Sequence, residues 1–175
     1  MKSNTKDNYA LQRLLPSKWE EYKTIRLEAL QTNPEMFGSN YLKEAAYSQN
    51  DWVSFLEDDT RAMFALYNEE SLIGLTGVAL KKEDATTAIL FASFIKPSHR
   101  NNGLSALFYQ ARINWAKHKK CRSIIVSHRA GNEVSKAANQ RFGFKFTDAK
   151  KVTWQDGICE DELMYSLQLK GHYIR

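Results

Sequence analysis

The segment from Ile95 to Ala106 carries the residue types in this chain that are best suited to chemistry. An apolar run ends at Pro97, and a short basic loop containing Gly103 then leads into a helical apolar pattern. A strand that ends in such a loop leaves backbone N–H groups unpaired at a helix N-terminus, and these groups and the helix dipole attract anions. The loop is therefore a candidate phosphate site, although an ordinary strand–turn–helix with a turn glycine has the same pattern.

The spacing Arg100-x-x-Gly103-x-Ser105 distinguishes this loop from two other phosphate-binding patterns. The dinucleotide fingerprint needs three glycines and the P-loop needs a lysine followed by serine or threonine, and neither is present. Gly103 suits a position where backbone approaches a ligand closely. The loop resembles the pyrophosphate loop, Q/R-x-x-G-x-G/A, of GNAT-type acyl-CoA N-acyltransferases.

A second segment extends the resemblance. GNAT enzymes often carry N-x-x-A-x-x-x-Y-x-x-x-G-F, and Asn132, Gly143 and Phe144 match it in identity and spacing. Asn132 lies 29 residues after Gly103, a step that also fits the family. The turn at residues 33–39 also resembles the acceptor-side turn of many members. Each residue has an ordinary structural role as well, since Asn132 suits a helix N-cap and Gly143 a helix C-terminus.

The resemblance implies acetyl-CoA as cosubstrate and names the residues that bind it. Backbone groups near Phe94 and Ile95 would hold the pantetheine arm and polarise the thioester oxygen. Asn132 and Asn139 would also contact the cofactor. The pyrophosphate would lie on the loop formed by Arg100, Asn101, Asn102, Gly103, Leu104, Ser105 and Ala106.

Two catalytic positions depart from the family pattern. Asn139 occupies the position of the tyrosine general acid, and an amide is not an acid near neutral pH. Ser135 stands where alanine is commoner, and its hydroxyl could hydrogen-bond the leaving thiolate. We therefore take Ser135 as the residue that assists the thiolate, and keep Asn139 beside it in the candidate catalytic set.

The chain also departs from the family pattern in the base that receives the amine proton. Many relatives place a glutamate on the strand that corresponds to residues 86–95, which has no carboxylate here, and Glu83 and Asp84 are assigned to the preceding turn. Solvent would then take the proton. His128, at a strand end, is an alternative base, but we interpret it as a structural histidine bound to backbone.

Local patterns predict the elements that carry these residues. The order of the expected elements, strands first, then βαβα, then a hairpin around Asp156-Gly157, indicates an α/β (α+β) protein with a mixed sheet. The resemblance specifies a mostly antiparallel sheet flanked by helices, with two splayed parallel strands. Strands are expected at 9–15, 62–67, 72–80, 86–95, 123–127, 144–154 and 162–169, and helices at 16–32, within 37–46, from 48 onward, at 104–115 and at 133–142.

Composition limits the class of protein. The 175 residues, 43% hydrophobic and 26% charged, fit one globular domain over residues 1–175. The net charge of +5 is spread along the chain and does not indicate nucleic-acid binding. A polar N-terminus, no apolar run of membrane length and two cysteines favour a cytoplasmic protein. His118 and Cys121 lack further ligands at suitable spacing, so no metal site is expected.

The expected acceptor is a primary amine on a small molecule or a peptide, and a homodimer is compatible with the resemblance. The acceptor itself cannot be named from the sequence. Because Asn139 and the strand at 86–95 both depart from the catalytic pattern, a non-catalytic acyl-CoA-binding sensor of the same fold is the alternative function.

Overall fold

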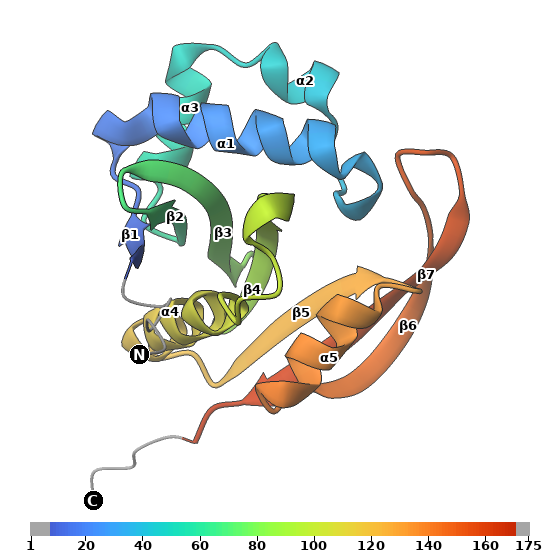
Figure 1. Ribbon diagram of the computed structural model, residues 1–175. Helices are drawn as coiled ribbons and strands as arrows, with labels where there is room; N and C mark the ends of the chain where they lie inside the picture. The colour runs from blue at the N-terminus through green and yellow to red at the C-terminus, as the bar shows by residue number, and fades with distance from the viewer. Residues whose placement is uncertain (1–7, 171–175) are drawn as a thin grey trace, which may run out of the picture.

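The computed structural model describes residues 8–170, which form a seven-stranded sheet in the order β1-β2-β3-β4-β5-β7-β6 (Figure 1). Neighbouring strands are antiparallel except β4 and β5, which are parallel. The mixed, mostly antiparallel sheet predicted from the sequence is confirmed. The strands are β1 (Tyr9–Arg13), β2 (Arg61–Asn68), β3 (Ser71–Lys81), β4 (Asp84–Ile95), β5 (Ser123–Arg129), β6 (Lys145–Thr153) and β7 (Cys159–Gln168).

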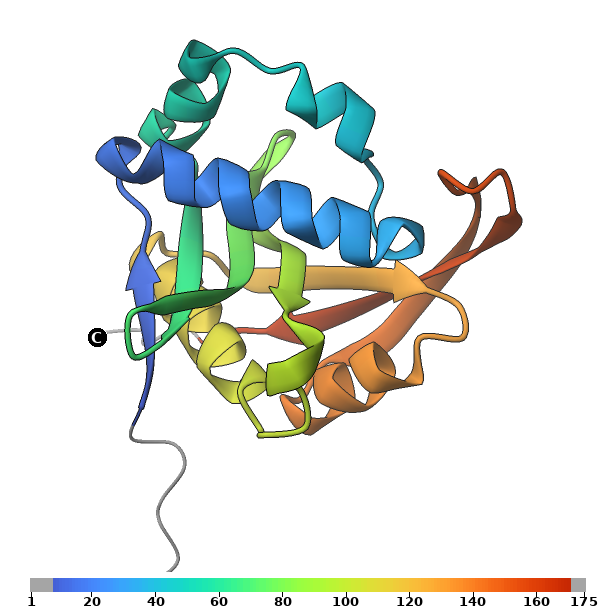
Figure 2. The same cartoon turned by 45° about the horizontal axis from the view of Figure 1, so that its top comes forward.

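Helices lie on both faces of the sheet (Figures 1 and 2). On one face α1 and α3 pack with Met63, Leu75 and Phe94 of the strands, and on the other face α4 packs with Leu90 and Val126. We call the face covered by α1 and α3 the α1 face, and the face covered by α4 the α4 face. The helices are α1 (Trp19–Thr32), α2 (Tyr41–Ala45), α3 (Gln49–Glu57), α4 (Ser105–His118) and α5 (Glu133–Arg141), with short 3-10 turns at Pro16–Lys18, Pro34–Met36 and Pro97–His99.

Local sequence explains the helix boundaries. Ser48 caps α3 in a capping box with Asp51, in which each side chain accepts a hydrogen bond from the other residue's backbone N–H. Asn132 caps α5 by accepting from the N–H of Ser135. Gly143 ends α5 with a φ of 85°, a left-handed conformation that glycine adopts without a steric cost. These caps agree with the boundaries predicted from the sequence.

The turn before β4 is shorter than predicted, because Asp84 is the first residue of the strand. Its carboxylate accepts hydrogen bonds from the hydroxyls of Thr86 and Thr87, both 2.6 Å away. Thr87 also contacts Ser123 of β5, with 3.0 Å between the hydroxyl oxygens. This network holds together the first ends of β4 and β5, which we call the closed end.

The parallel pairing of β4 and β5 ends after four residues. Thr87 to Leu90 pair with Ser123 to Val126, and no further pair joins the two strands among residues 8–170. Beyond that point β4 contains a bulge, since Gly77 of β3 pairs with Phe91 whereas Leu75 pairs with Phe94. A bulge bends its strand, so β4 and β5 diverge. The splayed pair predicted from the resemblance is confirmed, and we call this divergence the fork.

The β6–β7 hairpin forms one edge of the sheet, beside β5 (Figure 1). Every residue of the edge strand β6 is exposed except Val152, which is half-buried. Within the described chain, no helix has the length and apolar content needed to cross a membrane. The polar amino-terminal segment considered in the sequence, residues 1–7, lies outside the described residues.

Candidate functional site

The loop between β4 and α4 places free backbone donors beside the fork. Asn101 and Gly103 have left-handed φ angles of 64° and 70°, which turn successive peptide groups. In the described chain, the N–H groups of residues 101–104 donate to no protein acceptor, whereas those of Arg100 and Ala106 donate to Pro97 and Gly103. Free N–H groups at a helix N-terminus form an anion site. Residues 101–104 of the predicted loop thus have free donors, whereas the N–H groups of Arg100 and Ala106 do not, and phosphate binding by the loop stays a prediction.

The Arg100 side chain turns away from these donors. Its Nε donates to the Ile95 carbonyl oxygen at 2.7 Å, and its Nη2 donates to Oδ1 of Asn33 at 2.6 Å. Arg100 thus joins the end of β4 to the turn after α1. The Ile95 carbonyl, one of the backbone groups expected to hold pantetheine, is occupied by this guanidinium.

Arg112 of α4 supports the bulge from the α4 face. It is only 2% exposed, and its Nη1 donates to the Ser93 hydroxyl at 2.8 Å. Ser93 is also 3.0 Å from the Thr76 hydroxyl of β3. No carboxylate forms an ion pair with Arg112 among residues 8–170, and burial lowers its pKa to about 10. A buried cation therefore lies directly beneath the part of β4 that leaves the ladder.

Helix α5 carries both predicted catalytic residues, Ser135 and Asn139, which differ in burial and in hydrogen bonding. Ser135 is half-buried in the first turn, and its hydroxyl has no hydrogen bond within the described chain. Asn139 is 1% exposed and accepts a hydrogen bond from the Tyr109 hydroxyl of α4. Ser135 is available to a ligand, whereas Asn139 ties α5 to α4. A contact between Asn139 and the cofactor remains a prediction.

His128 has the structural contacts that we assigned to it. Its Nδ1 donates to the Arg129 carbonyl at 2.8 Å, and its ring stacks on Tyr165 with 5.3 Å between centroids. Only 8% of the residue is exposed. The imidazole therefore lies within the core on the α4 face, bound to backbone.

Sequence analysis did not predict the polar contacts that join β5 and the β6–β7 hairpin to the turn at residues 33–40. Arg129 of β5 donates to Asp156 at 2.6 Å, to Glu160 at 2.5 Å and to the Glu35 carbonyl at 3.4 Å. The two carboxylates raise its pKa further above the usual range, chiefly through these hydrogen bonds. Gln155 of the hairpin also donates to the Gly38 carbonyl at 3.1 Å. The β6–β7 hairpin is thereby fastened to the turn.

Two cavities flank the α1 region. One of about 250 Å³ borders the bulge at Phe91 and Ala92, and its walls include Trp52 and the ion pair between Arg26 and Glu44. Burial raises the pKa of Glu44, but the hydrogen bonds and charge of Arg26 outweigh burial and lower it below its usual value. This cavity borders the β4 side of the fork on the α1 face.

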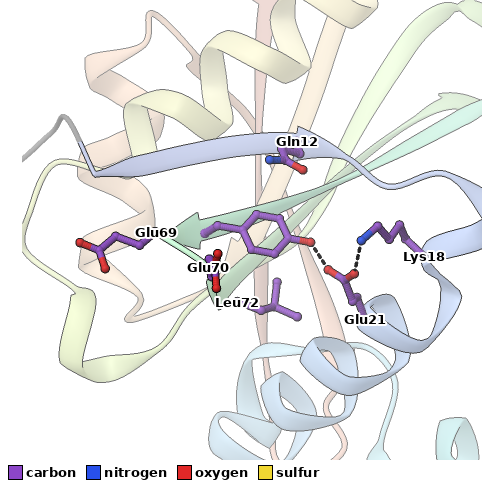
Figure 3. Close-up of a pocket in the computed structure, with 7 residues that line it drawn as sticks. Gln12, Lys18, Glu21, Glu69, Glu70 and Leu72 are labelled. Carbon is purple, nitrogen blue, oxygen red and sulfur yellow. Dashed lines mark hydrogen bonds and ion pairs between the residues drawn. The ribbon is translucent and has the colours of Figure 1, made fainter.

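The second cavity lies at the opposite edge of the sheet, beside β1 and β2 (Figure 3). Its central carboxylate, Glu21, already accepts hydrogen bonds from Lys18, at 2.6 Å, and from the Tyr67 hydroxyl. It is separated from the fork by the width of two strands. The chemistry of the fork does not involve it.

Comparisons with known proteins agree with this geometry. The family model described as the acetyltransferase (GNAT) family matches residues 19–144. No protein among the curated sequences matches the chain. Among solved structures, a GNAT-family acetyltransferase from Streptococcus pneumoniae is similar, with a TM-score of 0.78 and 16% identity over 92% of this chain and 99% of that one.

Two similar structures come from Salmonella typhimurium. YncA, determined with its cofactor acetyl-CoA, has a TM-score of 0.78 and 13% identity over 95% of this chain and 97% of its own. An acetyltransferase that modifies the N-terminal serine of ribosomal protein L7/L12 has a TM-score of 0.71 and 14% identity over 95% of this chain and 98% of that one. At these identities the similarity establishes a shared fold.

Proposed function

The chain belongs to the acetyltransferase (GNAT) family, whose model covers residues 19–144, and we propose that it transfers an acetyl group from acetyl-CoA to a primary amine. The observation that carries this proposal is the loop of free N–H groups at residues 101–104, which opens at the N-terminus of α4 beside the fork. The cofactor pyrophosphate binds there. The pantetheine arm then follows β4 into the fork and brings the thioester to the bulge.

The transfer is direct, from thioester to amine. The neutral amine attacks the thioester carbonyl, a backbone N–H near Phe94 stabilises the developing oxyanion, and Ser135 donates a hydrogen bond to the leaving thiolate. No covalent enzyme intermediate is required. The position of Cys121 supports this, because its thiol lies at the closed end, 3.9 Å from the Ala85 carbonyl, and burial raises its pKa.

The acceptor approaches from the α1 face. The cavity beside Phe91 and Ala92 opens there, and the turn at 33–40 and the β6–β7 hairpin border the fork on the same side. Primary amines of small molecules and of peptides are both candidate acceptors, and a structural neighbour acts on a peptide N-terminus. Entry opposite the cofactor allows the amine to reach the thioester without crossing the pantetheine arm.

The test is a panel of amines incubated with acetyl-CoA, with released CoA measured as free thiol. The panel includes lysine side chains, peptide N-termini, polyamines, aminoglycosides and amino-acid derivatives. We expect thiol release that depends on both the protein and one class of amine, and a matching acetylated product. Binding of acetyl-CoA without turnover of any amine would instead identify the chain as an acyl-CoA sensor.

A further inference from the structure

We propose that Glu162 of β7 is the base that takes the proton from the acceptor amine, and that Ser127 of β5 positions its carboxylate. The inference rests on the proposed function. It names a protein base for the amine proton, which the sequence analysis assigned to solvent. Its starting point is a hydrogen bond of 2.6 Å from the Ser127 hydroxyl to Oε1 of Glu162.

Ser127 is the first residue of β5 beyond the segment that pairs with β4. It directly follows Val126, the last β5 residue paired with β4. Val126 packs in the core on the α4 face, and side chains alternate along a strand, so Ser127 faces the α1 side with Phe91 of β4. Ser127 is exposed and Glu162 is half-buried. The pair therefore stands on the side from which the acceptor approaches.

Charge distinguishes Glu162 from the three other carboxylates at positions 156–161 of the hairpin. Asp156 and Glu160 bind Arg129, and Asp161 binds Lys151 at 3.1 Å. Glu162 forms no ion pair with any group in residues 8–170. Its carboxylate is thus available to a cation that comes from outside the protein.

The charged groups around Glu162 come from β5, β6, β7 and the turn at residues 33–40. Arg129 of β5 and Lys150 of β6 are its direct cross-strand partners. Arg129 is already held by its two carboxylates, and Lys150 is exposed. Glu160 lies two residues away on the same face of β7, and Glu35 of the 33–40 turn contacts Arg129 through its carbonyl. His128 lies on the opposite face of β5, where its ring stacks on Tyr165.

The spacing suits an amine held between β5 and the bulge. Paired strands lie about 4.8 Å apart, and β4 and β5 diverge beyond Val126, so an ammonium group beside the Ser127 hydroxyl lies in a gap wider than one strand spacing. A carboxylate there attracts the ammonium form, which predominates at neutral pH for a lysine-like amine with a pKa of about 10.4. The same carboxylate then receives its proton.

The proton and electron balance is complete. One ammonium proton moves to a Glu162 oxygen, and the freed nitrogen lone pair forms the C–N bond at the thioester carbonyl. The C–S bond breaks with its electron pair on sulfur, the nitrogen loses a second proton, and the thiolate gains one proton. Glu162 returns its proton to solvent, so one proton is released for each amide formed.

The experiment compares Glu162→Gln, Ser127→Ala and a matched control, Asp161→Asn, whose carboxylate faces the other side of β7. Glu162→Gln should lower kcat/KM for the amine by roughly 10²- to 10⁴-fold at neutral pH. The KM for acetyl-CoA should stay unchanged. Ser127→Ala should lose less, because the base remains, and Asp161→Asn should match the wild type.

The pH profile separates a base from a merely structural carboxylate. With Glu162 as base, the wild-type kcat/KM reaches a plateau well below the pKa of the amine. In Glu162→Gln it should rise tenfold per pH unit up to that pKa, because only the neutral amine reacts. A wild-type profile that already rises to the amine's pKa overturns the proposal without any variant, even if Glu162→Gln fails to fold.

Two further outcomes are decisive. Full activity in a folded Glu162→Gln variant overturns this inference and leaves the acetyltransferase proposal intact. A wild-type protein that releases no CoA with any amine of the panel overturns both.

Discussion

The two ends of the β4–β5 pair differ in how their polar groups are used. At the closed end, Asp84, Thr87 and Ser123 satisfy one another through hydrogen bonds of 2.6 and 3.0 Å. At the fork, Ser127 is exposed and the N–H groups of residues 101–104 donate to no acceptor in the described chain. One pair of strands thus has mutually paired polar groups at one end and, beside its other end, backbone N–H groups that have no acceptor. The proposed site lies where the pairing of β4 with β5 stops.

The largest expected effect is the loss of cofactor binding in Gly103→Glu. The substitution forces a non-glycine residue into a left-handed φ of 70° and adds negative charge beside the proposed pyrophosphate. Acetyl-CoA should raise the melting temperature of the wild type by mass action and should have no effect on the variant. The control is Gly157→Glu in the hairpin, where φ is 80° and a Cβ meets no atom within 4 Å. An unchanged shift in Gly103→Glu would remove the loop from the site.

Next in size is the effect of Ser135→Ala on turnover. If the hydroxyl assists the thiolate, kcat should fall by about 10- to 1,000-fold with little change in the KM for acetyl-CoA. The Asn132 cap uses the backbone N–H of residue 135, so the melting temperature should not change. Ser54→Ala, on the exposed side of α3, is the control. Full turnover in Ser135→Ala would leave Ser135 with only its capping contact.

A smaller effect is expected from Ala92→Gly, which tests whether the bulge stores strain. Ala92 has a left-handed φ of 56°, which costs an L-residue roughly 1–2 kcal/mol. Glycine removes that cost but adds about 0.5–1 kcal/mol of backbone entropy, so denaturant titration should show equal or up to ~1 kcal/mol higher stability. Turnover should fall severalfold as the fork loosens. Ala149→Gly, in β6 without a left-handed φ, should only destabilise, and the same loss in Ala92→Gly would contradict stored strain.

The smallest effect is expected at the closed end, from Asp84→Asn. Hydrogen bonds from Thr86 and Thr87 lower the pKa of Asp84 from 3.8 to about 2. A lowered folded-state pKa stabilises the protein above the unfolded value, and this contribution is lost as the pH falls toward about 2. Melting temperatures measured against pH should therefore show a small deficit in the variant at neutral pH that disappears near pH 2. A deficit that persists at pH 2 would assign the effect to packing.

Sequence patterns predicted the turns and caps on the proposed cofactor side of the fork because their signals are local. Gly103, Asn132 and Gly143 each specify a turn or cap within a few residues, and neighbouring apolar runs specify the strands that carry them. The predicted start of β4 was two residues too late. Aspartate is typical of turns, but here Asp84 begins the strand and accepts hydrogen bonds from Thr86 and Thr87. Errors of this kind change a boundary and leave the topology intact.

The proposed acceptor side could not be predicted, because distant segments assemble it. Ser127 and Glu162 are 35 residues apart, and Arg129 joins a hairpin to a turn 94 residues earlier in the chain. Only the register of β5 on β7 brings these residues together. The burial of Asn139 beneath Tyr109 likewise depends on how α5 packs against α4. A strand assignment without its register contains none of this information.

The exposed edge strand β6 bears on how copies of this protein meet. An open sheet presents unpaired backbone groups at its outermost strands, and these groups can extend the sheet into a neighbouring molecule. Lys145, Lys150 and Lys151 are all exposed along β6. Two such strands brought side by side would place like charges in contact, which opposes continuous β-sheet between copies. This repulsion opposes aggregation along a flank of the sheet that no other element of the described chain covers.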